Sequence, residues 1–142
     1  MGIKILKPSI YLGSDKLNVD KVFKLKKSLI INKIGSNILH KENKKSLLQM
    51  SLIAAKNAIK THKLNPKFLI YVSQGQDKVL PSAAENLAHQ LGLKNKMLVL
   101  TISAGCSGFV QAISLANKFL NKEISSGLIV CAEKYSKYID KN

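Results

Sequence analysis

Apolar positions in the last two-thirds of the chain follow two alternating patterns. In one pattern, apolar residues recur every three or four positions, which is typical of a helix with one buried face. In the other, short continuous runs rich in β-branched and aromatic residues are bounded by turn-forming residues, which is typical of buried strands. The first pattern predicts helices at 46–63, 82–91 and 106–122, and the second predicts strands at 68–74, 97–103 and 127–133.

The predicted helices carry boundary signals and apolar faces of their own. Ser82 and Glu85 stand at the spacing of a capping box, and Gly92 can end that helix. The third helix is apolar nearly all round in its first turns, which predicts deep burial. The expected apolar faces are Leu48, Leu52, Ala55 and Ile59 in the first helix, Ala84, Ala88 and Leu91 in the second, and Phe109, Ile113, Ala116 and Leu120 in the third.

The succession of strand, helix, strand, helix and strand predicts an α/β layered fold with a mostly parallel sheet and helices on both faces. Residues 3–13 combine β-branched residues with a proline and are expected to hold an early strand, and residues 29–34 are strand-like. In such sheets, ligands bind beyond the carboxyl ends of the strands. The segments 74–77, 103–106 and 133–135 follow predicted strands, so we expect functional groups there.

The chain is strongly basic, with a formal net charge of +15 over 142 residues, but all of its 23 basic residues are lysine. Proteins that read nucleic acids usually rely on arginine for bidentate contacts and on aromatic side chains for stacking. Aromatic residues are few here and do not alternate with the lysines. We therefore do not expect a nucleic-acid partner, whereas an acidic protein or a phosphorylated carrier fits the charge.

The compartment is predicted from the cysteines and from the apolar segments. The uncharged stretch 97–117 is long enough to span a bilayer, but the serines and glycines at its centre make a poor continuous helix. We expect no membrane span. The N-terminus lacks the long apolar core of a secretory signal, and two cysteines do not make a disulfide framework. These features predict a cytoplasmic protein with both thiols free.

Cys106 lies in the segment TISAGCSGFV, at the predicted turn from a strand to a helix. A thiol reacts as thiolate, and a helix N-terminus favours negative charge. Gly105 and Gly108 allow a sharp turn and the close approach of a substrate, and the Cys106 amide is placed to donate to an oxyanion. A cysteine between glycines is also often a small buried residue, and spacing alone does not separate the two interpretations.

A cysteine nucleophile needs a base or a cationic partner, and the local pattern supplies none. His40, His62 and His89 all lie away from the carboxyl ends of the predicted strands, so each is interpreted as a surface residue. None has metal-ligand spacing with Cys106, and no metal site is predicted. Cys131 lies within an aliphatic strand and is predicted to be a core residue.

Two blocks of the sequence resemble β-ketoacyl-acyl carrier protein synthase III, a family of thiolase-fold condensing enzymes. The run from Leu100 to Asp140 has the family's cysteine in a Cys-Ser-Gly-Phe setting, then an alanine-rich helix, a hydrophobic strand and a Glu-x-x-Ser turn. The run YVSQGQDKVLPSAAENLAHQLGL, at 71–93, resembles the family's block of a strand, a Pro-Ser-x-Ala segment and a Leu-Gly pair. The resemblance covers 45–140 well and the first 44 residues loosely.

The resemblance implies an acyltransferase with Cys106 as nucleophile and its amide as an oxyanion donor. The pocket residues implied with it are Leu80, Gly105, Ser107, Gly108 and Phe109. No permanently bound cofactor is implied. The substrates are acyl-coenzyme A and the phosphopantetheine thioesters of acyl carrier protein, and the product belongs to fatty-acid-like biosynthesis. A homodimer would form through the strand 97–103, with Leu80 shaping the acyl pocket of the partner.

The sequence also departs from the family's pattern. The histidine and asparagine that drive decarboxylation belong to a C-terminal half that has no counterpart here, so residues 1–142 are interpreted as an incomplete N-terminal thiolase-like domain, inactive in condensation by itself. Gln76 stands where the family often has proline. Two alternatives stay open: a non-catalytic module for dimerisation or carrier-protein binding, and a basic nucleic-acid-binding domain.

Overall fold

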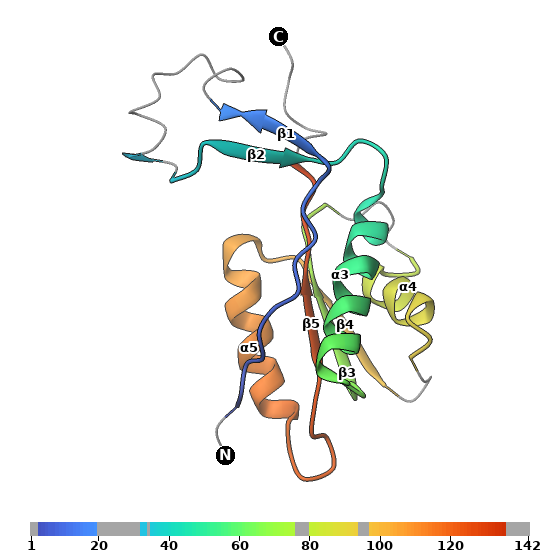
Figure 1. The fold of residues 1–142 in the computed structure, drawn as a ribbon. Helices are drawn as coiled ribbons and strands as arrows, with labels where there is room; N and C mark the ends of the chain where they lie inside the picture. The colour runs from blue at the N-terminus through green and yellow to red at the C-terminus, as the bar shows by residue number, and fades with distance from the viewer. Residues whose placement is uncertain (1–2, 20–31, 34, 76–79, 94–96, 136–142) are drawn as a thin grey trace. The chain divides into compact units, whose positions relative to one another are not determined.

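The structure is a computed structural model that describes residues 3–19, 32–33, 35–75, 80–93 and 97–135 (Figure 1). The chain divides into two compact units. The larger unit comprises Met1–Tyr11 and Ser46–Lys137, and the smaller comprises Leu12–Lys45 and Tyr138–Asn142. Each unit is described by itself.

The larger unit is built on a parallel sheet of three strands in the order β4-β3-β5. These strands are β3 (Phe68–Val72), β4 (Leu98–Ile102) and β5 (Leu128–Cys131). Val72 stands opposite both Ile102 and Cys131, so the three strands end side by side at one edge of the sheet. The strand predictions are confirmed, with somewhat shorter strands than the apolar runs suggested.

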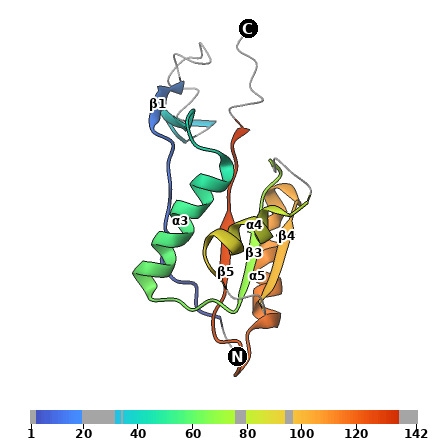
Figure 2. The same cartoon turned by 90° about the vertical axis from the view of Figure 1, so that its right-hand side faces the viewer.

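Helices cover both faces of this sheet, as the sequence predicts. Helices α3 (Leu47–His62) and α4 (Ala83–Gln90) lie on one face, and α5 (Gly108–Phe119) lies on the other (Figure 1). Figure 2 views the sheet from the side of α3 and α4, with α5 behind it. The α/β layered fold predicted from the alternation of patterns is confirmed.

Strand β3 is buried along its whole length and supplies both layers of the core. Leu69 and Tyr71 pack toward α3 and α4, whereas Phe68, Ile70 and Val72 pack toward α5. This division follows from the two-residue period of a strand, which sends successive side chains to opposite faces. A continuous apolar run is therefore what a central strand with helices on both sides requires.

Side-chain caps fix the starts of the two helices on the first face. The hydroxyl of Ser82 accepts a hydrogen bond from the Glu85 backbone, and the Glu85 carboxylate accepts one from the Ser82 backbone, at 2.7 Å. This confirms the predicted capping box. Ser46 and Gln49 form the same arrangement at the start of α3. Gly92, with φ of +67°, follows α4 as expected.

Helix α5 is less buried than its sequence predicts. Only Gly108, Ala112 and Ala116 are buried, and Phe109 and Val110 are 48% and 67% exposed. The prediction of a deeply buried helix is wrong for this unit because the sheet covers only one side of α5. The buried stripe consists of small residues, so the helix lies close to the sheet. Phe109 and Val110 stay largely exposed at its start, whereas Phe119 at its end packs against Phe68 of β3.

In the described part of the smaller unit, the strands β1 (Asp15–Asn18) and β2 (Ile38–Lys41) form an antiparallel pair. The strand expected within 3–13 is not formed. A strand needs a neighbouring ladder, and the proline in this segment cannot donate to one. Its part in the larger unit is held instead by a contact of 2.8 Å between the Lys7 carbonyl and His62 Nε2. Most of the expected strand 29–34 lies outside the described residues.

Candidate functional site

Cys106 lies on the short connection between β4 and α5. The connection is a 3-10 turn, Gly105–Ser107, that runs directly into α5. Gly105 has φ of +55°, a left-handed conformation that glycine adopts without strain. Both the backbone and the hydroxyl of Ser107 donate to the Ala104 carbonyl, at 3.2 and 2.7 Å. These bonds hold Cys106 at the start of the helix, as the sequence predicts.

The backbone N–H of Cys106 precedes the first hydrogen bonds of this turn, which Ser107 and Gly108 donate. The first N–H groups of a helix have no partner within it. Cys106 therefore combines an exposed thiol with an adjacent amide that the helix does not use. An amide in this position can stabilise a negatively charged oxygen at a carbon attached to the sulfur.

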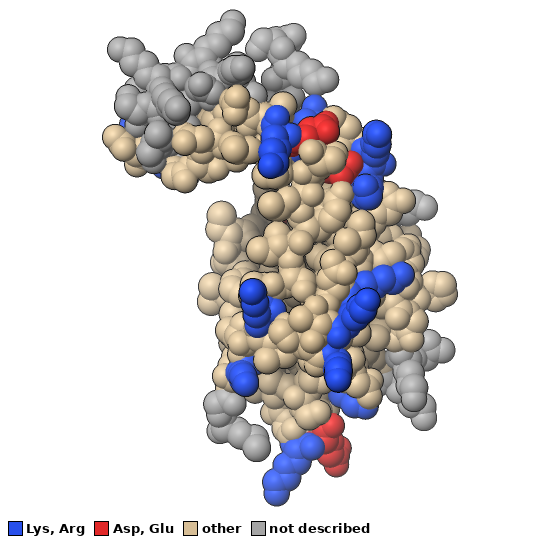
Figure 3. All heavy atoms as spheres, viewed as in Figure 1, with Lys and Arg blue, Asp and Glu red and all other residues tan. Residues whose placement is uncertain are grey.

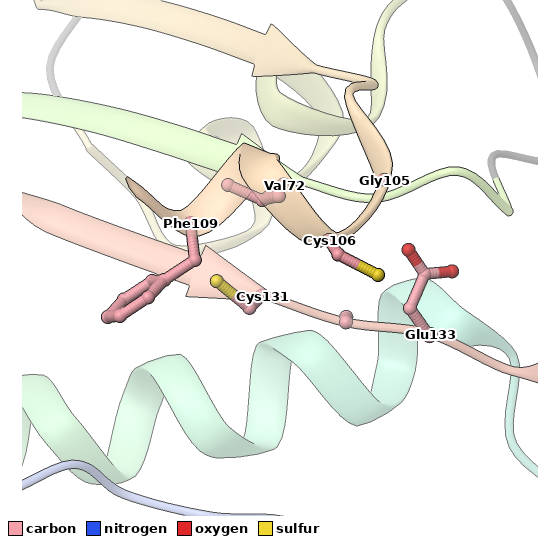
Figure 4. A pocket seen from close by; sticks show the side chains of 7 residues that line it. Val72, Gly105, Cys106, Phe109, Cys131 and Glu133 are labelled. Carbon is pink, nitrogen blue, oxygen red and sulfur yellow. The ribbon is translucent and has the colours of Figure 1, made fainter. Parts of the chain in front are cut away.

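A pocket of about 320 Å³ opens beside the thiol. The side chains of Cys106 and Cys131 both reach it, the first pointing toward the carboxylate of Glu133 and the second toward the ring of Phe109 (Figure 4). The pocket therefore has an apolar end at Phe109 and an acidic end at Glu133. The lining residues are Val72, Gly105, Cys106, Phe109, Cys131, Ala132 and Glu133.

The prediction that Cys131 is a core residue is wrong, because the side chain is exposed and lines the pocket. Cys131 is the last residue of β5, and the strand alternation turns it toward the α5 face at the open edge of the sheet. Partial burial and the negative charge of Glu133 raise the pKa of the Cys131 thiol. The two free cysteines of the chain therefore share one pocket but differ in their surroundings.

Polar groups from the ends of β3 and β5 gather next to this pocket. Glu133 Oε1 accepts a hydrogen bond of 2.8 Å from the backbone N–H of Gln74. The hydroxyl of Tyr135 donates to the side-chain oxygen of Gln74 at 2.6 Å. The sequence places these segments beyond the carboxyl ends of strands, but it gives no signal that Gln74, Glu133 and Tyr135 bond to one another.

The pocket residues implied by the resemblance fall into two groups. Gly105 and Phe109 line the pocket with Cys106. Ser107 and Gly108 support the turn instead, Ser107 through the Ala104 carbonyl and Gly108 by packing against the sheet. Leu80 lies on a different loop, where its side chain is 80% exposed before a cis proline.

No histidine accompanies Cys106 in this pocket. His40 is an exposed residue of β2, His89 is an exposed residue of α4, and His62 is the half-buried last residue of α3. Within the described ranges, no three histidine, cysteine or acidic side chains come close enough together to hold a metal ion. The described site thus combines an exposed thiol with the amide at the start of the turn, and none of the described residues that line it is a histidine.

Two surface properties bear on possible partners. The lysine side chains on the face shown in Figure 3 lie at several separate places and do not form a single patch. Of the helices that the structure describes, none combines the length and the apolar character needed to cross a bilayer. The uncharged stretch 97–117 instead forms a strand, a turn and most of a helix.

The comparisons with known proteins agree with this arrangement. The family model described as 3-oxoacyl-[acyl-carrier-protein] synthase III matches residues 100–142, the segment that contains Cys106 and Glu133. Beta-ketoacyl-[acyl-carrier-protein] synthase III of Aquifex aeolicus is 28% identical over 99% of this chain and 47% of its own length. The enzyme of the same name from Lactococcus lactis subsp. lactis is 28% identical over 94% of this chain and 41% of its own.

The solved structure of the Aquifex aeolicus synthase III matches with a TM-score of 0.86 and 26% identity, over 99% of this chain and 48% of that one. The thiolase-type layered fold and the resemblance to the synthase III family, both predicted from the sequence, are confirmed. The chain spans about half the length of the curated relatives that it matches.

Proposed function

We propose that Cys106 is the acyl-accepting nucleophile of an acyltransferase of the β-ketoacyl-acyl carrier protein synthase III type. One observation carries this proposal. The Cys106 thiol stands at the start of α5, beyond the carboxyl ends of three parallel strands, and opens into a pocket. The same turn lies within the segment that matches the family model. The acyl donor is a thioester of coenzyme A.

In the proposed step, the Cys106 thiolate attacks the carbonyl carbon of the thioester. A carbon–sulfur bond forms to Cys106, and the carbonyl oxygen becomes an oxyanion that the Cys106 amide stabilises. Collapse of this intermediate breaks the original carbon–sulfur bond and expels coenzyme A as a thiolate. Val72 and Phe109 give one end of the pocket an apolar wall suited to the acyl chain. No permanently bound cofactor takes part.

The second step, decarboxylation of malonyl-acyl carrier protein and condensation, requires a histidine and an asparagine, and neither is among the described residues that line this pocket. We place residues 1–142 as the N-terminal part of the thiolase-type fold, with the decarboxylating groups supplied by the other half. Coverage of 41–48% of the relatives supports this placement. The chain by itself is therefore expected to accept an acyl group without condensing it. The proposed compartment is the cytoplasm.

The proposed assembly is a homodimer through the outer edge of β4, within 97–103. This strand is at one edge of the described sheet, and Leu98 on it is 44% exposed. Leu80, at 80% exposed, is free to contribute to the acyl pocket of the partner. The net charge of +15 suits an acidic acyl carrier protein as the second substrate.

The acyl-transfer proposal is tested by incubating the chain with acetyl-coenzyme A and locating the acetyl group by peptide mapping. We expect a thioester on Cys106 in the wild-type chain and in the matched control Cys131→Ser, and none in Cys106→Ser. The proposal is overturned if Cys106 stays unacylated in a chain whose Cys106 is still alkylated by iodoacetamide, because the thiol would then be accessible but unable to accept an acyl group.

The non-catalytic alternative is a module for dimerisation or carrier-protein binding. It predicts a Cys106 that iodoacetamide alkylates but acetyl-coenzyme A does not acylate, together with a dimer in solution. A nucleic-acid-binding domain predicts retention on duplex DNA that falls steeply with salt, because each phosphate contact releases counterions. Measuring acylation, oligomeric state and salt-dependent retention on one preparation separates the three functions.

A further inference from the structure

The loop after β3 and the loop after β5 are joined by side chains where the strand ladder ends. The Ala132 backbone donates to the Val72 carbonyl at 3.1 Å, which extends the parallel ladder by one bond beyond the last paired residues. Ser73, the residue after β3, donates its amide to Ile102 of β4. The next amide on the β5 side, that of Gln74, donates to the carboxylate of Glu133 instead of to a backbone carbonyl of β5. A side chain from one strand end thus replaces a ladder bond and fixes the backbone of the other.

The side chain of Gln74 is oriented by a second bond. Its oxygen accepts from the Tyr135 hydroxyl at 2.6 Å, which leaves its NH₂ group to face the other way. Desolvation, with a smaller effect from the negative charge of Glu133, raises the pKa of Tyr135, and the protonated phenol is the donor in this bond. Tyr135 therefore determines which end of the Gln74 side-chain amide faces the turn Gly105–Ser107, which carries Cys106.

The nitrogen end of Gln74 lies against Gly105, the residue before the nucleophile. A Cβ atom on Gly105 would lie 2.9 Å from Gln74 Nε2, which is closer than ordinary van der Waals contact. Gly105 has φ of +55°, and this conformation sets the direction in which the next residue leaves the strand. The amide of Gln74 thus packs directly against the hinge of the turn that presents Cys106.

We propose that Gln74, Glu133 and Tyr135 form a positioning cluster that holds the Gly105 turn, and so the Cys106 thiol, in the geometry for attack on the acyl donor. This inference rests on the proposed function and adds residues from two other loops to it. Glu133 fixes the Gln74 backbone, Tyr135 fixes the Gln74 amide, and the amide packs against Gly105. The three residues act through Cys106 and are not themselves reactants.

The test uses the 142-residue chain and two readouts. Backbone amide NMR shifts of Gly105 and Cys106 report the position of the turn. Single-turnover S-acylation of Cys106 by acetyl-coenzyme A reports its consequence. In Tyr135→Phe and Gln74→Ala, we expect both amide signals to move and the maximal acylation rate to fall about tenfold, with the half-saturating donor concentration unchanged.

Two comparisons separate positioning from general effects on the fold. Gln90→Ala, at an exposed glutamine of α4, is the matched control for Gln74→Ala and should leave both readouts unchanged. Glu133→Gln keeps an oxygen that can accept the Gln74 bond and should retain the wild-type turn, whereas Glu133→Ala should not. Because Tyr135 acts through Gln74, the chain with both Tyr135→Phe and Gln74→Ala should be acylated no more slowly than the chain with Gln74→Ala alone.

Each failure has its own meaning. Unmoved Gly105 and Cys106 amides in both Tyr135→Phe and Gln74→Ala would overturn the cluster, whatever the acylation rate. Moved amides with an unchanged rate would show that the cluster orders the turn without serving attack, which also overturns the proposal. Absence of acylation in the wild-type chain would contradict the proposed function, while the amide shifts would still decide whether these residues hold the turn.

Discussion

A Cβ atom on Gly108, the first residue of α5, would lie 2.6 Å from Cγ1 of Val72, the last residue of β3. The first turn of the helix therefore rests directly on the central strand, and this contact holds the adjoining turn Gly105–Ser107, which carries Cys106, at the sheet edge. Valine is stiff at χ1, so its methyl group cannot easily move aside. The close approach depends on the absence of a side chain at Gly108.

Gly108→Ala is predicted to destabilise the larger unit. Overpacking costs about 1–3 kcal/mol, and replacing a helical glycine by alanine recovers about 0.5–1 kcal/mol. We expect the free energy of unfolding in urea to fall by about 1–2 kcal/mol. Ser114→Ala, at an exposed position of the same helix, is the control and should change stability little. A Gly108→Ala chain as stable as the wild type would contradict the close packing.

Gly105→Ala and Gly92→Ala form a second matched pair, because both glycines have positive φ, +55° and +67°. Each substitution should cost about 1–2 kcal/mol for the left-handed conformation. Among the residues that the structure describes, none lies within 4 Å of a Cβ on Gly92, whereas Gln74 obstructs one on Gly105. Gly105→Ala is therefore expected to be the more destabilising, as measured by urea unfolding. The excess should disappear in a Gln74→Ala background, and its persistence there would exclude Gln74 as the cause.

The capping box of α4 predicts a pH dependence. Hydrogen bonds from the Ser82 backbone and side chain lower the pKa of Glu85 below its usual 4.5. Because the folded-state pKa is the lower one, this carboxylate stabilises the fold fully above the usual pKa, and the contribution is lost as pH falls through the lowered value. The stability difference between the wild type and Glu85→Gln, measured by urea unfolding, should shrink between about pH 6 and pH 3.

Helix α3 provides the reciprocal experiment. It has the same box with Gln49 in place of the glutamate, and its first turn carries no acidic residue. Gln49→Glu should therefore add stability at neutral pH that vanishes at low pH, since a negative charge is favourable at a helix N-terminus. A pH-independent effect in both variants would show that the hydrogen bonds alone matter and the charge does not.

Cys131 should alkylate slowly at neutral pH, because partial burial and Glu133 raise the pKa of its thiol above the usual 9.0. In a folded Cys106→Ser chain, the rate at which iodoacetamide alkylates Cys131 should still increase as pH rises above 9. In the same chain unfolded in urea, the increase of this rate should occur at lower pH than in the folded chain. Glu133→Gln removes one of the two causes and should shift the native profile part of the way back. Coincident native and unfolded profiles would contradict this account.

Local patterns in the sequence determined the framework between residues 46 and 135. Helical spacing around Leu52 and the continuous run of β3 located their elements because the signal lies within a few neighbouring residues. The Ser82–Glu85 cap has the same origin. The succession of these elements then placed Cys106 beyond a strand end, since parallel strands direct their carboxyl ends to one edge. The resemblance to synthase III sequences is the basis of the chemistry that we propose for that position.

Only the tertiary structure decided which side chains surround Cys106. The partners of Gln74 lie 59 and 61 positions away in the sequence, at Glu133 and Tyr135, and no local pattern links groups so far apart. Cys131 illustrates the same limit. Its aliphatic neighbours indicate a core position, but the strand ends there, so the residue faces an open pocket. Periodicity determines which face a side chain occupies, whereas packing between distant elements determines what covers that face.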